Sequence, residues 1–109
     1  MIKVMIERNK DQTIHTFTMK GHADSGPHGQ DLVCAGASAV SFGAVNAIHE
    51  ICSVPLEVDM KGEGGYLRCS VPSQLDPSTY EKVQLLLEGM LVSLKTIEAQ
   101  YGQYIKIKS

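Results

Sequence analysis

The chain has 109 residues, of which 43% are hydrophobic and 20% are charged, and its formal net charge at pH 7 is −2. This length and composition predict a single soluble globular domain spanning residues 1–109, and they exclude a disordered or fibrous protein. The small negative charge gives no overall basic surface for nucleic acid.

The charged residues are distributed unevenly along the chain. No Lys or Arg occurs between Lys20 and Lys61, whereas five acidic residues lie in that stretch. Nucleic acid binds to cations or to many backbone donors, so we expect no nucleic-acid partner. The uncharged stretch from Leu32 to His49 is interrupted by Ser, Gly and Asn, so we expect neither a signal segment nor a membrane partner. Three cysteines, an odd number with no close pair, favour a reducing cytoplasm over a disulfide framework.

The first twenty residues predict a β-hairpin. Ile2, Val4 and Ile6 alternate with other residues, and residues 13–20 are rich in β-branched and aromatic side chains. The polar segment 9–12 between them is the expected turn. The following segment, from Gly21 to Gln30, contains enough Gly and Pro to predict a loop without regular structure.

A long apolar helix is predicted next. Asp31 can accept backbone hydrogen bonds in its first turn, and the residues from Leu32 to about Cys52 are apolar or small on nearly all sides. Such a helix must be covered on more than one side. Its many small residues, such as Gly36 and Ala37, predict close packing against the sheet together with either a second helix or a second subunit.

A second hairpin is predicted between residues 55 and 71. After Pro55, Leu56, Val58 and Met60 alternate with charged residues, which predicts that these three face the core. A glycine-rich turn at residues 62–65 leads into the partner strand. The residues expected on the inward face of that strand are Leu67, Cys69 and Val71.

The last third of the chain predicts a helix and a short strand. Asp76 and Pro77 form a typical helix start, since Pro at the first helical position leaves no amide hydrogen unpaired. Residues 83–101 carry an apolar stripe at three- and four-residue spacing, and Gly102 is placed to end the helix. Residues 104–108 alternate as a strand. The order ββαββαβ predicts an α+β fold, a two-layer sandwich in which two helices cover a mostly antiparallel sheet.

Cys34 is the main candidate for chemistry. It would lie about three residues inside its helix, where unpaired amides and the positive end of the macrodipole favour a thiolate. Cysteine and histidine form a known nucleophile and base pair, and His22 and His28 are the nearby histidines. Three glycines of the loop have a backbone that can bend closely around a substrate: Gly21, Gly26 and Gly29. In the alternative interpretation, Cys34 is a small buried hydrophobic residue and the histidines are solvated.

A zinc site is the main rival interpretation. The possible ligands are His22, Asp24, His28, Asp31 and Cys34. Their spacing matches no regular zinc pattern, so we expect no metal and no cofactor. The spacing from Gly21 to Gly26 resembles the start of a phosphate-binding loop but lacks the Lys and Ser/Thr that follow in such loops.

The remaining cysteines and Ser38 have less specific roles. Cys52 and Cys69 are expected in the core. Ser38 follows Cys34 by one helical turn and therefore lies on the same helix face. It could donate a hydrogen bond to the thiolate or to a substrate, and a small packing residue is the alternative.

The stretch from Gly21 to Ser38 resembles the ribosomal-processing cysteine proteases (Prp) of Firmicutes and related bacteria. The matching residues are Gly21-His22-Ala23, Gly29, Asp31, Val33-Cys34-Ala35 and Ser38. In length and element order, the resemblance covers essentially the whole chain. It implies that Cys34 is the nucleophile and His22 the general base, with Asp31 and Ser38 as supporting residues. His28 is not part of the motif, which weakens the zinc interpretation.

The resemblance also implies a substrate and an assembly state. The expected substrate is the N-terminal extension of large-subunit ribosomal protein twenty-seven, which is removed before or during ribosome assembly and ends in a pair of aromatic residues. The expected assembly is a homodimer. Two alternatives are a non-catalytic module that binds a ribosomal protein or assembly factor, and a zinc-dependent hydrolase.

Overall fold

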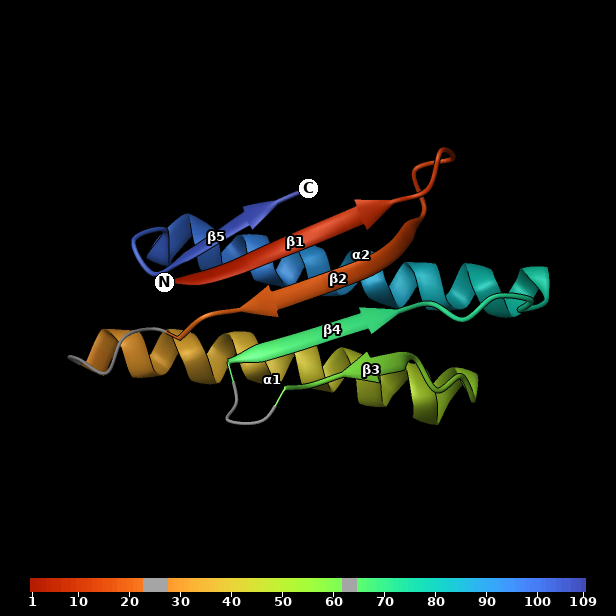
Figure 1. The fold of residues 1–109 in the computed structure, drawn as a ribbon, viewed down its shortest axis with the longest axis horizontal. Coiled ribbons are helices and arrows are strands. Elements are labelled where there is room, and N and C mark those ends of the chain that lie inside the picture. The colour runs from red at the N-terminus through yellow and green to blue at the C-terminus, as the bar shows by residue number, and fades with distance from the viewer. Residues whose placement is uncertain (23–27, 62–64) are drawn as a thin grey trace.

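Five strands in one sheet and two long helices make up the fold (Figure 1). The computed structural model describes residues 1–22, 28–61 and 65–109, with residues 28–31 described by their backbone only. In chain order the elements are β1 (Ile2–Arg8), β2 (Ile14–Lys20), α1 (His28–Cys52), β3 (Glu57–Asp59), β4 (Tyr66–Ser70), α2 (Pro77–Tyr101) and β5 (Ile105–Lys108). The predicted order ββαββαβ is confirmed. The predicted turn at residues 62–65 lies outside the described residues, except for Gly65.

The strands are arranged in the order β3-β4-β2-β1-β5. Every neighbouring pair is antiparallel except β1 and β5, which run parallel. Both helices lie on the same side of the sheet, as Figure 1 shows. The prediction of a two-layer α+β fold with a mostly antiparallel sheet is therefore confirmed.

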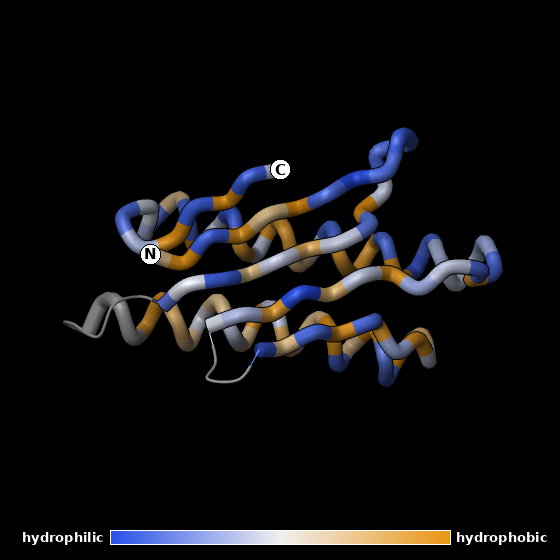
Figure 2. Tube along the Cα trace, in the orientation of Figure 1, coloured by the Kyte–Doolittle hydropathy of each residue, from blue (hydrophilic) through white to orange (hydrophobic). Residues whose placement is uncertain are grey.

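The inner face of the sheet is apolar across its central strands. Ile6 of β1 lies opposite Phe17 of β2, and Phe17 lies opposite Cys69 of β4. All three side chains are buried in the core that the helices cover. Figure 2 shows that the tip between β1 and β2 is hydrophilic. The alternation read from the sequence thus identified the face that the helices cover.

Helix α1 begins three residues before Asp31, the residue predicted in its first turn. The prediction that residues 21–30 form no regular structure is wrong for the last three, His28, Gly29 and Gln30, which are helical. A single Gly in a helix costs only about 1 kcal/mol relative to Ala, so Gly29 does not prevent a long helix from extending through it. Cys34 is therefore the seventh residue of the helix rather than about the third.

The small residues of α1 allow α2 to approach closely. A Cβ built on Gly36 would lie 3.6 Å from Cδ1 of Ile97 in α2, which is van der Waals contact. This confirms the predicted close packing against a second helix. Residues 32–52 have a mean hydropathy of 1.5, and by length and composition they could span a membrane. Core helices pass the same test, and α1 buries Val33, Ala37 and Ile48 among core residues from the sheet and α2.

Strand β3 is shorter and more exposed than the sequence pattern predicts. Val58 lies opposite Cys69, so it faces the predicted side of the sheet. However, only Leu56 is buried, whereas Val58 is 45% exposed and Met60 is 60% exposed. The reason is that β3 is the edge strand, and an edge strand has no neighbour on one side to complete its cover.

Helix α2 begins and ends where the sequence indicates. Asp76 is its N-cap residue and accepts a hydrogen bond from the Thr79 backbone N–H at 3.2 Å, and Pro77 is the first helical residue. Most of the predicted stripe is buried. Gly102 follows the last helical residue with a φ of −59°, so it ends the helix without the left-handed conformation common at that position.

The N-cap makes the stability of α2 dependent on pH. Hydrogen bonds from the side chains of Thr79 and Ser78 and from the Thr79 backbone lower the pKa of Asp76 from 3.8 to about 2. Because the folded pKa lies below the unfolded value, the stabilisation is present above about pH 4 and is lost as the pH falls toward 2. We expect Asp76→Ala to lower Tm by about 5 °C at pH 7 and by progressively less below pH 4. Thermal melts by circular dichroism between pH 7 and pH 2 test this, and a difference that stays constant would contradict it.

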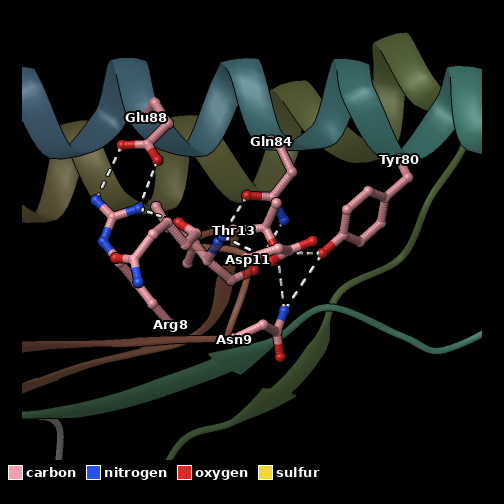
Figure 3. A network of polar contacts seen from close by, with 9 residues as sticks. Arg8, Asn9, Asp11, Thr13, Tyr80, Gln84 and Glu88 are labelled. Atoms are coloured by element: carbon pink, nitrogen blue, oxygen red, sulfur yellow. Dashed lines mark hydrogen bonds and ion pairs between the residues drawn. The ribbon is translucent and has the colours of Figure 1, made fainter.

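A polar network ties the tip of the β1–β2 hairpin to α2 (Figure 3). The side-chain amide of Gln84 accepts from the Ile14 N–H at 2.7 Å and donates to the Ile14 carbonyl at 2.8 Å. Arg8 forms an ion pair with Glu88 at 2.7 Å. The other labelled members are Asn9, Asp11, Thr13 and Tyr80. These contacts fix the end of the hairpin that lies far from Gly21.

Candidate active site

A cavity of about 510 Å³ lies where α1, β2 and the β3–β4 hairpin meet. Its lining residues are Ile2, Met19, Gly21, His22, Cys34, Ser38, Phe42, Met60, Lys61, Gly65, Tyr66 and Leu67. The candidate nucleophile Cys34, the candidate base His22 and Ser38 therefore share one cavity, although they come from two different parts of the fold. We call this cavity the His22–Cys34 cavity.

Helix α1 supplies one wall of the His22–Cys34 cavity. Cys34, Ser38 and Phe42 are spaced four residues apart, so they lie on one helix face. The Cys34 side chain is half-buried and packs against the core. The field of a helix end falls off within the first turn, and Cys34 is the seventh residue. Cys34 therefore lies beyond the first turn of α1 rather than within it.

The backbone on either side of the His22 side chain is held by two hydrogen bonds. The Gly21 N–H donates to the Gly65 carbonyl at 2.8 Å, and the amino nitrogen of Met1 donates to the His22 carbonyl at 2.9 Å. Gly21 has a φ of +95°, and a Cβ at this position would collide with the Met1 carbonyl oxygen. Residue 21 must therefore be glycine for the chain to turn from β2 toward His22 in this way.

The opposite wall of the cavity comes from residues that the sequence analysis did not single out. Met60 and Lys61 follow β3, Gly65 directly precedes β4, and Tyr66 is the first residue of β4. The Lys61 ammonium nitrogen lies 5.4 Å from the centre of the Tyr66 ring, within the range of a cation–π contact. In the sequence these residues show only a strand pattern and a turn. The 60% exposure of Met60, which the alternation predicted to face the core, became evident only in the structure.

Several predicted site residues fall outside what the structure describes. The side chains of Asp31 and His28 are not described, and Gly26 lies in the segment 23–27. Gly29 belongs to the first turn of α1 by its backbone. Among the described residues, no group of three His, Cys, Asp or Glu side chains could hold a metal ion.

The other two cysteines have structural positions. Cys69 is buried on β4, and burial raises the pKa of its thiol from 9.0 to about 12. A thiol with so high a pKa stays protonated at neutral pH and is a poor nucleophile. Cys52 is half-buried at the last residue of α1. The prediction that both pack with the core is confirmed, which leaves Cys34 as the cysteine that lines the cavity.

Comparison with known proteins identifies the family of this chain. Residues 1–106 match the model of the family described as Cysteine protease Prp. The chain is 47% identical over 107 residues to the ribosomal processing cysteine protease Prp of Bacillus subtilis, which covers 98% of this chain and 96% of that protein.

Two solved structures of the essential ribosomal processing protease Prp from S. aureus share the fold. One contains a covalently linked product peptide and matches with a TM-score of 0.86 at 40% identity. The other contains a substrate peptide and matches with a TM-score of 0.87 at 39% identity. Each match covers 99% of this chain and 98% of the other. The chain therefore belongs to the Cysteine protease Prp family and is a cysteine protease.

Proposed function

We propose that this protein is a cysteine endopeptidase that removes the N-terminal extension of large-subunit ribosomal protein twenty-seven during ribosome assembly. Cys34 is the nucleophile and His22 the general base. The observation that carries the proposal is that these two side chains line one cavity, in a chain whose relatives are ribosomal processing proteases. The resemblance also leads us to propose that the protein acts as a cytoplasmic homodimer.

The proposed reaction has two covalent steps. The Cys34 thiolate attacks the carbonyl carbon of the scissile bond and forms a carbon–sulfur bond. The tetrahedral intermediate then breaks its carbon–nitrogen bond, and the His22 imidazolium donates a proton to the leaving amine. Water attacks the resulting thioester and gives a proton to His22, which releases the cleaved peptide and restores the thiolate. A relative captured with a covalently linked product peptide supports an attachment of this kind.

Supporting roles fall to residues close to the reacting pair. Ser38 lies one turn beyond Cys34 on the same cavity wall, where its hydroxyl can donate to the thiolate or to a substrate carbonyl. Asp31 is proposed as a supporting residue on the strength of the resemblance. The first four residues of an α-helix have backbone N–H groups with no hydrogen-bond partner within the helix. In α1 we propose these N–H groups as donors to the oxyanion of the tetrahedral intermediate.

The walls of the cavity suit an apolar substrate segment. Phe42 from α1, Met60 just after β3 and Tyr66 from β4 all line the cavity and present apolar or aromatic surface. Apolar and aromatic walls bind aromatic side chains well, because such side chains bury large areas and stack on rings. This agrees with an extension that ends in a pair of aromatic residues.

An assay with the precursor tests the proposed substrate and the thiol chemistry together. We expect the purified protein to release the extension from ribosomal protein twenty-seven, with a new N-terminus after the aromatic pair detected by mass spectrometry. Iodoacetamide should block the reaction, and a chelator should leave it unchanged. A precursor whose two aromatic residues are replaced by Ala is the matched control and should be cleaved much more slowly. Full activity after complete alkylation of Cys34 would contradict the proposal, and loss of activity in the chelator alone would favour the zinc hydrolase.

A further inference from the structure

Gly65 occupies a special position beside the proposed base. It lies directly before β4, forty-three residues after His22, and is not part of the motif between Gly21 and Ser38. Its φ is +75°, which is the left-handed region that favours glycine. It also lines the His22–Cys34 cavity. Gly65 therefore combines a conformational requirement with a place in the active site.

The imidazole of His22 fills the space that a side chain at residue 65 would need. A Cβ built on Gly65 would lie 2.7 Å from Cε1 and 3.1 Å from Cδ2 of the ring, and closer still to Nε2. Real Cβ atoms do not approach other heavy atoms at the shortest of these separations. Any residue other than glycine at position 65 must therefore move the His22 ring, the β4 backbone or both.

Gly65 also holds the chain next to His22. Its carbonyl accepts the hydrogen bond from the Gly21 N–H at 2.8 Å, one residue before the histidine. Gly65 thus leaves room for the His22 imidazole, and its carbonyl also holds the backbone next to His22. Two independent contacts, one steric and one polar, connect Gly65 to the position of the imidazole.

We propose that Gly65 is a positioning residue that sets the location of the His22 imidazole relative to Cys34. The inference rests on the proposed role of His22 as general base. Proton transfer requires hydrogen-bond geometry between the base and its partner, and a displacement of about 1 Å can lower a rate about 100-fold. A methyl group at residue 65 displaces the ring, so it lowers the rate without removing any reacting group.

The competing explanation is that Gly65 is only a turn residue whose φ excludes other residues. Two substitutions separate the explanations. Gly65→Ala adds a Cβ and also strains the backbone, whereas Gly65→Asn adds a Cβ to a backbone that Asn tolerates better. Strain alone predicts that Asn recovers both stability and rate relative to Ala. Displacement of the ring predicts that Asn recovers stability only.

The first experiment measures kcat, KM and Tm of these variants on a peptide with the sequence of the extension. We expect kcat to fall about 10- to 100-fold in both variants, with KM changed by less than about threefold. Gly89→Ala in α2 is the matched control, since a Cβ there meets nothing within 4 Å. It should leave kcat unchanged. The ¹H–¹⁵N signals of the His22 imidazole should shift in both Gly65 variants and not in the control. Recovery of kcat together with Tm in Gly65→Asn would overturn the proposal.

A double-mutant cycle with His22→Ala completes the test. Without an imidazole to displace, Gly65→Ala should cost less than about twofold in the rate of cleavage. Where cleavage is too slow to follow, the rate of Cys34 alkylation by iodoacetamide at one fixed pH replaces it. If Gly65→Ala lowers the rate as much in the His22→Ala background as it does in the unmodified protein, the proposed role of Gly65 is overturned. Wild-type activity of His22→Ala itself would instead overturn the proposed base, so the two failures are distinguishable.

Discussion

Replacing Cys34 with Ala is expected to abolish cleavage of the extension, with a loss in kcat of at least about 10⁴-fold. The physical reason is that no thioester can form without the sulfur, and losses of this size or larger follow removal of a nucleophile in proteases. Peptide binding should persist, because the apolar walls of the cavity come from other residues. Single-turnover cleavage followed by mass spectrometry measures the rate, and a fluorescent peptide measures the binding.

Cys52→Ala is the matched control for this substitution. Cys52 ends the same helix about 27 Å from Cys34, as the rise of an α-helix over eighteen residues requires. We expect its kcat to equal that of the unmodified protein. Cys69 should stay unalkylated by iodoacetamide at neutral pH, because its buried thiol is protonated. Cleavage by the Cys34→Ala variant at more than a few per cent of the original rate would exclude the proposed nucleophile.

Replacing Gln84 with Leu is expected to lower the free energy of unfolding by about 2 to 4 kcal/mol. Gln84 is 8% exposed, and its amide satisfies both the N–H and the carbonyl of Ile14 at the start of β2. Leu has nearly the same volume but no polar atoms, so two buried backbone groups lose their partner, at about 1 to 3 kcal/mol each, and burial of the apolar Leu side chain offsets part of this loss. Figure 3 shows that this contact joins α2 to the β1–β2 hairpin.

Urea unfolding at 25 °C measures the change in the free energy of unfolding. Gln100→Leu provides the matched control, since Gln100 lies on the exposed face of the same helix. Its effect should stay within about 0.5 kcal/mol. At temperatures where the Gln84 variant remains folded, its kcat should be close to that of the unmodified protein, because Gln84 does not line the His22–Cys34 cavity. Equal stability of the two variants would show that the Ile14 groups find other partners.

Much of the secondary structure followed from local patterns in the sequence. The alternation of Ile2, Val4 and Ile6 predicted β1 and its inward face, and Asp76 with Pro77 predicted the start of α2. These features depend on a few consecutive residues, so the local sequence contains the information that defines them. The motif from Gly21 to Ser38 likewise identified His22 and Cys34 as candidates, by resemblance to a family to which the chain belongs.

The boundaries of some elements depended on contacts that a local pattern does not contain. The start of α1 at His28 follows from the cooperative extension of a 25-residue helix, which includes Gly29 despite the low helix propensity of Gly. The exposure of Val58 follows from the position of β3 at the edge of the sheet. Alternation tells which face a side chain takes, but it does not tell which strand lies alongside.

The sequence by itself determined the class of fold, the order of elements and the pair of residues proposed to react. The tertiary structure alone decided what surrounds that pair. Strand order places the β3–β4 hairpin beside α1, and this brings Met60, Gly65 and Tyr66 to the cavity that contains Cys34. The physical reason is that these residues meet His22 through strand pairing between segments more than forty residues apart. A close approach such as that of Gly65 to the imidazole exists only once the sheet has formed.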